Sequence, residues 1–107
     1  MQTITVQELK KRLDAGENIH LVDVREAYEN AEFNIGGLLL PVGEIRNMQT
    51  DPIDDWKGDE IILYCRSGNR SGQATLILEQ LGFENVKNLT GGMIAWQENF
   101  GAGSSVR

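Results

Sequence analysis

The only cysteine of this 107-residue chain, Cys65, lies in the segment "IILYCRSGNRSG", directly after an apolar run. Arg66 follows it immediately, and Arg70 comes a few positions later, with Gly68 between the two cations. A thiol close to cations and to the start of a helix loses its proton readily, and the thiolate is the nucleophilic form. Cys65 is therefore the first candidate for covalent chemistry.

The elements expected around Cys65 would place it at a binding edge. Residues 61–64 are densely apolar, which indicates a buried strand, and residues 71–81 carry apolar side chains at helical spacing up to Gly82. Ligands of parallel sheets bind where strands end and helices begin. Gly68 permits a tight turn there, and the backbone N–H groups of the loop would point toward the sulfur as an anion-binding nest.

The simpler interpretation is that Cys65 only packs in the core. Free cysteines are commonly buried, and Arg66 and Arg70 would then be solvated side chains. A packing cysteine, however, requires neither Gly68, nor two flanking arginines, nor a helix that starts directly after it. We therefore expect a reactive thiolate at Cys65.

The rest of the chain predicts alternating helices and strands. Thr5 and Glu8 have the spacing of a capping box for a helix over residues 6–14. Further expected elements are strands at 19–24, 38–42 and 85–89, short helices at 26–33 and 43–48, a connecting loop at 50–60, and a last helix that starts at Gly91 and Gly92. This alternation indicates an α/β domain with a central, mostly parallel sheet.

Composition excludes several classes of function. The net charge is −6 and no long basic cluster occurs, which argues against a nucleic-acid partner. The absence of a signal-peptide pattern and of a long apolar run predicts a cytoplasmic protein without a membrane partner. One cysteine and one histidine support neither a disulfide nor a metal site, so no cofactor is expected. The length predicts one domain over residues 1–100. The tail at 101–107 contains only Ala102 and Val106 as apolar residues and is expected to be disordered.

Three motifs resemble those of the rhodanese family. The loop "CRSGNR" resembles the six-residue active-site loop of that family, Cys-Arg-x-Gly-x-Arg. The segment "DVREAYE" at 23–29 resembles its Asp-Val-Arg-Glu segment, and "LTGGMIAW" at 89–96 resembles its Leu-x-Gly-Gly-x-x-x-Trp ending. The motifs occur in the order found in the family, so the resemblance implies a rhodanese-like three-layer α/β/α fold.

One segment departs from the pattern of the family. Where many members read Gly-His-Ile-Pro-Gly-Ala, this chain has "FNIGGL", with Asn34 in place of the histidine and Gly36 in place of the proline. That histidine is not the sulfur acceptor in the family. The departure therefore concerns substrate range or partner choice rather than the reaction itself.

The resemblance implies a thiosulfate sulfurtransferase. Cys65 would attack the outer sulfur of a small anionic donor such as thiosulfate and form a persulfide. It would then pass that sulfur to cyanide, to a thiol or to a protein sulfur acceptor, in two steps through a covalent intermediate.

The other site residues implied by the resemblance have supporting roles. Arg66 and Arg70 would attract the anionic donor, with Arg70 also bracing the loop. Ser67, Gly68 and Asn69 would contribute backbone N–H groups that stabilise the persulfide. Two further residues, Asp23 and Arg25, are expected to tie adjacent loops together.

Two alternatives remain open at this stage. A cysteine phosphatase or arsenate reductase of the same topology places its arginine one position later in the loop, where this chain has Ser71. A non-catalytic rhodanese module used for protein binding would keep the fold with an unreactive Cys65.

Overall fold

The computed structural model of the protein describes residues 1–101, so the tail expected at 101–107 lies outside the described residues except for Gly101. A single sheet forms the centre, with strand order β1-β5-β4-β2-β3 and with every pairing parallel. The strands are β1 (Gln2–Ile4), β2 (His20–Asp23), β3 (Leu38–Leu39), β4 (Glu60–Tyr64) and β5 (Asn85–Leu89).

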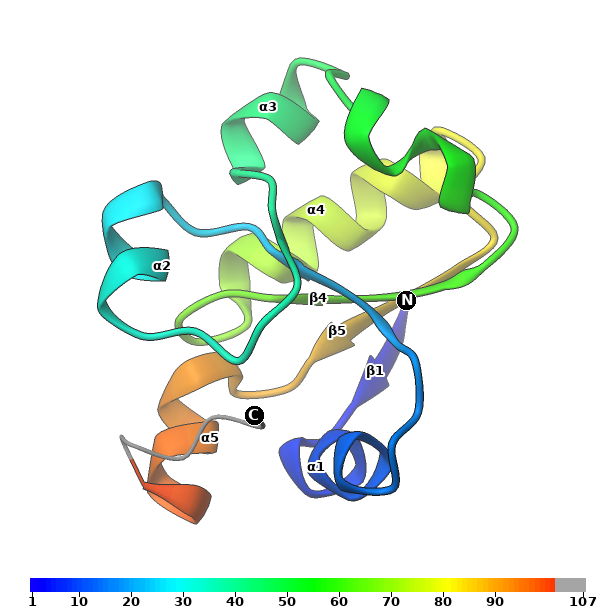
Figure 1. Ribbon diagram of the computed structural model, residues 1–107. Helices are drawn as coiled ribbons and strands as arrows, with labels where there is room; N and C mark the ends of the chain where they lie inside the picture. The colour runs from blue at the N-terminus through cyan, green and yellow to red at the C-terminus, as the bar shows by residue number, and fades with distance from the viewer. Residues whose placement is uncertain (102–107) are drawn as a thin grey trace.

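Helices cover both faces of the sheet, which confirms the predicted three-layer α/β/α architecture (Figure 1). The helices are α1 (Val6–Asp14), α2 (Ala27–Glu32), α3 (Val42–Arg46), the 3-10 helix η1 (Asp51–Trp56), α4 (Asn69–Gln80) and α5 (Gly92–Phe100). One face carries α3, η1 and α4, and the other carries α1 and α5 (Figure 1). Among the residues described, no helix has the length and apolarity needed to span a bilayer.

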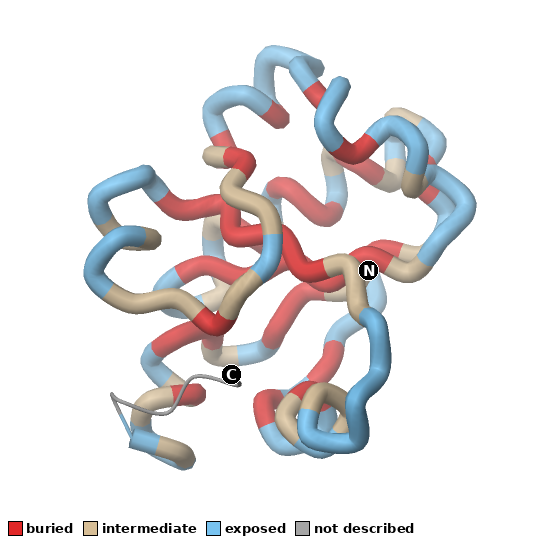
Figure 2. Tube along the Cα trace, viewed as in Figure 1, coloured by how far each residue is buried: buried red, intermediate tan, exposed pale blue. Residues whose placement is uncertain are grey.

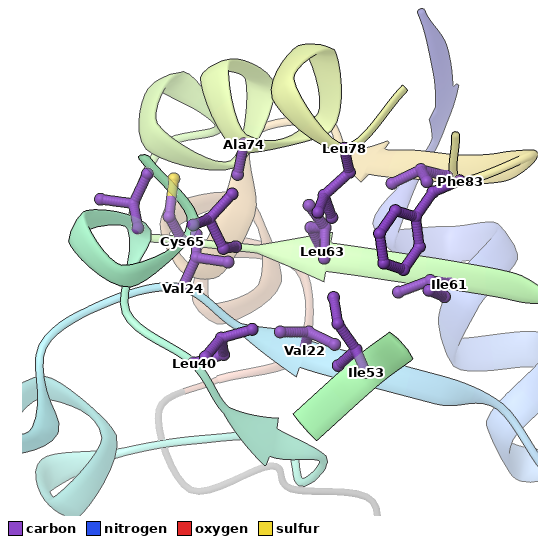
Figure 3. Packing of buried hydrophobic residues seen from close by; sticks show 13 residues of the cluster. Val22, Val24, Leu40, Ile53, Ile61, Leu63, Cys65, Ala74, Leu78 and Phe83 are labelled. Atoms are coloured by element: carbon purple, nitrogen blue, oxygen red, sulfur yellow. The ribbon is translucent and has the colours of Figure 1, made fainter. Parts of the chain in front are cut away.

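Strand β4 and the residue after it supply both hydrophobic layers. Ile61, Leu63 and Cys65 point into the layer beneath α4, where Ala74 and Leu78 pack against them (Figure 3). The alternate residues of the strand face α1 and α5, as the period of two requires. Because both faces of β4 are covered, the strand is almost continuously buried (Figure 2).

The predicted elements agree with the structure in most places. The capping box of α1 is present, with the Glu8 amide donating to the Thr5 hydroxyl and the Thr5 amide donating to the Glu8 carboxylate. Helix α4 begins at Asn69 rather than near Ser71, because Gly68 adopts φ +103° as its N-cap and starts the helix early. Arg70 therefore belongs to the first turn of a helix and not to the loop.

Two elements were not predicted. Strand β1 is only three residues long and is exposed at Gln2 and Thr3, so it shows no apolar pattern and exists through its pairing with β5. The segment predicted as a connecting loop contains η1, where Pro52 stands at the helix start and the buried Ile53 anchors the turn. A single buried residue gives no helical periodicity that could be read from the sequence.

The turn before β3 explains the departure at Asn34 and Gly36. Asn34 donates through Nδ2 to the carbonyl of Asn30 (2.9 Å), and its Oδ1 accepts the N–H of Gly36 (2.8 Å). Gly36 has φ +96°. A proline has neither an N–H group nor access to that conformation, so the asparagine and the glycine form a matched pair.

Gly37, which follows in the same turn, packs tightly against β2. It has φ +91°, and a Cβ there would lie 2.4 Å from the backbone oxygen of Leu21. Gly36→Ala is a matched control, because Gly36 also has a positive φ but nothing within 4 Å of its Cβ position. We expect Gly36→Ala to lower the free energy of unfolding by about 1 kcal/mol and Gly37→Ala by about 2 kcal/mol more. Urea unfolding measures both, and equal losses would contradict the close approach.

Candidate active site

Two helices with glycine N-caps meet at Cys65. Gly68 caps α4 with φ +103°, and Gly91 caps α5 with φ +77°; neither uses a side chain to cap its helix. The first N–H groups of a helix have no partner within the helix and need acceptors elsewhere. At the start of α4 the acceptor is Cys65 Sγ, and at the start of α5 the acceptors are the carbonyl oxygens of Cys65 and Arg66.

Helix α4 directs its donors at the sulfur. The Gly68 N–H lies 3.1 Å from Cys65 Sγ, and the N–H and the hydroxyl of Ser71 each lie 3.4 Å from it. Burial raises the pKa of the Cys65 thiol, but these hydrogen bonds, led by that of the Ser71 hydroxyl, outweigh it and lower the pKa below its usual value. The site therefore favours an anionic sulfur.

Helix α5 holds the backbone that carries this sulfur. The N–H of Met93 donates to the carbonyl of Cys65, and the N–H of Ile94 donates to the carbonyl of Arg66, both at 2.9 Å. Gly92 has φ +54°, and a Cβ there would lie 2.4 Å from the Cys65 carbonyl oxygen. The paired glycines thus allow α5 to approach the loop closely enough to fix it.

Burial alone does not distinguish a reactive Cys65 from a packing one. The residue is only 1% exposed and belongs to the hydrophobic layer beneath α4 (Figure 3). A packing thiol needs no hydrogen bonds, whereas Cys65 receives them from two residues of the α4 N-terminus. The arrangement is that of an anion site built into the edge of a core.

The two arginines that follow Cys65 have different surroundings. Arg70 forms two hydrogen bonds to the Glu29 carboxylate, at 2.7 and 2.9 Å, and so ties α4 to α2. Arg66 is exposed, and within residues 1–101 it forms no salt bridge. Glu29 thus neutralises much of the charge of Arg70, whereas Arg66 has no acidic partner among residues 1–101. Glu29 ended one of the sequence motifs, but nothing in the sequence connected it with Arg70.

Asp23 and Arg25 join neighbouring loops, and neither reaches the sulfur. The Arg25 guanidinium donates twice to the Asp23 carboxylate, at 2.8 Å each, and once to the carbonyl of Phe33 at 2.6 Å. Asn30 donates to the same carboxylate at 2.9 Å. These contacts attach the segment after β2 to the end of α2.

Tyr64 of β4 fixes the turn that follows α2. Its hydroxyl donates to the carbonyl of Gly36 (2.9 Å) and accepts the N–H of Ile35 (3.4 Å). Burial raises the pKa of Tyr64, so the group stays a neutral hydroxyl. The guanidinium of Arg25 lies 5.5 Å from the centre of its ring.

Ser71 and Asn88 are site residues that the sequence did not single out for chemistry. The Ser71 hydroxyl lies 2.5 Å from Asn88 Oδ1, and Asn88 Nδ2 donates to the carbonyl of Gly68 at 3.2 Å. Ser71 stands where the phosphatase alternative requires arginine, and it is fully buried. The position of Ser71 directly after the loop could have marked it as a site residue from the sequence. Nothing in the sequence could have marked Asn88, because only the register of β5 brings it close to Ser71.

A small cavity of about 210 Å³ lies beside the loop. Arg66 and Glu32 give it charged walls, and Phe33, Met93 and Ile94 give it apolar ones. Arg25, Glu29 and Gln97 complete the lining, so side chains of both charges face the cavity. Ser67 and Asn69 are exposed.

Over the part of the chain that the structure describes, no cluster of His, Cys, Asp and Glu could hold a metal ion.

Comparison with known proteins agrees with this geometry. Residues 5–99 match the model of the Rhodanese-like domain. The chain belongs to the rhodanese family. It is 41% identical over 95 residues to a sulfurtransferase of Allochromatium vinosum, covering 87% of this chain and 85% of that protein. It is 37% identical over 99 residues to the putative sulfurtransferase YtwF of Bacillus subtilis, covering 91% of each.

Solved structures show the same rhodanese fold. A rhodanese-like domain protein from Staphylococcus aureus superposes with a TM-score of 0.79 at 32% identity, covering 90% of this chain and 91% of that one. The human single-domain sulfurtransferase TSTD1 gives a TM-score of 0.76 at 29% identity, covering 92% and 96%. Other relatives are longer: the chain spans 49% of the putative sulfur carrier protein YrkF of B. subtilis and 24% of the probable adenylyltransferase/sulfurtransferase MoeZ of Mycobacterium tuberculosis.

The Glu29–Arg70 pair predicts a pH dependence of stability. The Arg70 guanidinium lowers the pKa of Glu29 from 4.5 to about 2, although burial acts in the opposite direction. The pair therefore stabilises the fold fully above pH 4.5, and this contribution is lost as the pH falls toward 2. We expect Glu29→Gln to lower the free energy of unfolding by about 1–2 kcal/mol at pH 7, and by about half of that or less at pH 3.

Denaturant unfolding of wild type and variant at both pH values measures this difference. Glu32→Gln is the matched control, because Glu32 lies on the same helix but is exposed. It should change stability little at either pH. A Glu29→Gln loss that is the same at pH 7 and pH 3 would contradict the role of the ion pair.

Proposed function

We propose that this protein is a sulfurtransferase that carries a sulfane sulfur on Cys65 and that thiosulfate is a competent donor. The observation that carries the proposal is the convergence of the Gly68 and Ser71 donors on the sulfur of the only cysteine. Membership of the rhodanese family and the relatives named as sulfurtransferases support the reaction class.

In the first half-reaction, the Cys65 thiolate attacks the outer sulfur of the donor. A bond forms between Sγ and that sulfur, and the bond between the two donor sulfurs breaks, so that sulfite leaves with the electron pair. The product is a persulfide whose outer sulfur carries the negative charge. Arg66 draws the anionic donor to an otherwise acidic protein, and the N–H groups at the α4 N-terminus stabilise the charge.

In the second half-reaction, an acceptor such as cyanide or a thiolate attacks the outer sulfur. The sulfur–sulfur bond breaks and its electron pair returns to Cys65 Sγ, which regenerates the thiolate. The recessed position of Cys65, which is 1% exposed, restricts acceptors to small molecules or to slender extended groups. Relatives named as a sulfur carrier and as adenylyltransferase/sulfurtransferases support a protein as a further acceptor for this chain.

The covalent intermediate gives a direct test. With one cysteine in the chain, a persulfide at Cys65 cannot resolve into an intramolecular disulfide, so it should accumulate when donor is supplied without acceptor. Intact mass after incubation with thiosulfate and removal of the donor should show one added sulfur atom, which cyanide then removes as thiocyanate. Cys65→Ser should stay folded, gain no sulfur and have no turnover.

The contrary outcomes are equally specific. Turnover of thiosulfate and cyanide by folded Cys65→Ser would refute covalent transfer through this residue. An unchanged wild-type mass with thiosulfate and with other persulfide donors would favour a non-catalytic binding module. Hydrolysis of an aryl phosphate through a phosphocysteine would favour the phosphatase alternative.

Substitution of Arg66 and of Arg70 should have different effects on the steady-state kinetics. Arg66→Ala should raise the KM for thiosulfate several-fold and reduce its salt dependence, because it removes the exposed cation beside the site. Lys11→Ala is the control, since it changes the net charge equally from an exposed position on α1. Arg70→Ala should instead lower kcat, because it frees the α4 N-terminus from Glu29. Equal effects of Arg66→Ala and Lys11→Ala on KM would show that only net charge matters.

A further inference from the structure

The Ser71 hydroxyl faces two acceptors with a single proton. Its oxygen lies 2.5 Å from Asn88 Oδ1 and 3.4 Å from Cys65 Sγ. A hydroxyl can donate only one hydrogen bond at a time. The side chain is fully buried, so water does not take over either contact. At any moment the Ser71 hydroxyl therefore donates its hydrogen bond either to Asn88 Oδ1 or to Cys65 Sγ.

The orientation of the Asn88 amide is fixed by its other contact. Nδ2 donates to the carbonyl of Gly68 at 3.2 Å, and this leaves Oδ1 facing Ser71. A reversed amide would set Oδ1 against the Gly68 carbonyl, which offers only lone pairs. Gly72 leaves room for this arrangement, because a Cβ there would lie 3.3 Å from Nδ2. Asn88 thus acts as a permanent acceptor toward Ser71.

The charge on the sulfur decides which acceptor the hydroxyl prefers. An ionised acceptor forms a stronger hydrogen bond than a neutral one. A thiolate at Sγ therefore competes well with Asn88 for the proton, despite its longer distance. A neutral thiol does not compete, and its own S–H can donate to the Ser71 oxygen.

We propose that Asn88 is a positioning residue for the reaction, which holds the Ser71 hydroxyl proton while Cys65 Sγ is neutral and yields it whenever Sγ is a thiolate. The proposal deepens the proposed function, on which its catalytic meaning rests. During loading, Sγ changes from a thiolate to the neutral inner atom of the persulfide, and the hydroxyl turns back to Asn88. During discharge, the electron pair of the broken sulfur–sulfur bond returns to Sγ, and the hydroxyl turns to it again.

The consequence for catalysis is selective stabilisation of the leaving thiolate. The backbone N–H groups of Gly68 and Ser71 are donors fixed at the start of α4, whereas the Ser71 hydroxyl can rotate and donates to Sγ only when that atom carries charge. No net proton is gained or lost, because the hydroxyl proton only rotates between two acceptors.

The charged groups near the sulfur stay constant in the test that follows. Helix α4 contributes Arg70, with Glu29 of α2 as its partner, and the loop contributes Arg66. Asp23 at the end of β2 is paired with Arg25 in the segment that follows. On β5 the facing residue is the neutral Asn88, and the first turn of α5 presents the uncharged Met93 and Ile94.

A double-mutant cycle tests the shared proton without requiring sulfur transfer. The rate of Cys65 alkylation by iodoacetamide against pH gives the thiol pKa, and the single cysteine makes the signal unambiguous. Ser71→Ala should raise the pKa of Cys65 by about 1 in the wild-type background. In the Asn88→Leu background it should raise the pKa more, because there the hydroxyl can donate only to the sulfur. Any loosening of the loop by Asn88→Leu is common to both proteins of that background and cancels.

A control and a second background make the test decisive. Thr75→Val removes a buried hydroxyl that donates to the Ser71 carbonyl (2.7 Å) and not to the sulfur, so the pKa of Cys65 should not change. If Asn88→Leu does not fold, Asn88→Val takes its place, since valine also lacks the amide and suits a β-strand. The effect of Ser71→Ala should again be larger there than in wild type.

Three results would overturn the proposal. They are no effect of Ser71→Ala in wild type, an equal or smaller effect when Asn88 is replaced, and a Thr75→Val shift as large as that of Ser71→Ala. Failure of the proposed function looks different, because the alkylation cycle would show the expected coupling while no donor loads a sulfur. If loading does occur, Ser71→Ala should slow discharge by cyanide about tenfold, with loading above the pKa little changed.

Discussion

The site depends on the unpaired N–H groups at the start of two helices. A helix start normally finds its acceptor in a capping side chain, as α1 does with Thr5. Helices α4 and α5 are capped by Gly68 and Gly91 instead, and their donors turn to Cys65, one helix to the sulfur and the other to the backbone. The lowered pKa of the thiol and the fixed course of the loop both follow from this exchange of partners.

The sequence predicted those parts of the site that depend on neighbours along the chain. Cys65, Gly68 and the two arginines lie within one short segment, and the strand before it and the helix after it have clear apolar patterns. The fold class followed from the same local alternation. The early start of α4 was missed, because a glycine N-cap carries no side chain that marks a boundary.

Contacts between distant segments were not predictable in the same way. Glu29 and Asn88 meet the loop only because of the strand order and the register of β5. Strand β1 exists through a partner at the other end of the chain. The replacement of the usual histidine and proline by Asn34 and Gly36 looked like two changes in the sequence, but in the structure it is one hydrogen-bonded turn.

The depth of Cys65 also governs which covalent bonds the protein can form with copies of itself. A disulfide brings two sulfur atoms to about 2 Å and the two Cβ atoms to about 4 Å. A cysteine that is 1% exposed, with its backbone held by α5, cannot bring its Cβ so close to an equally recessed residue of a second molecule. Air oxidation should therefore not cross-link the protein into covalent dimers, and its thiol remains open to slender partners alone.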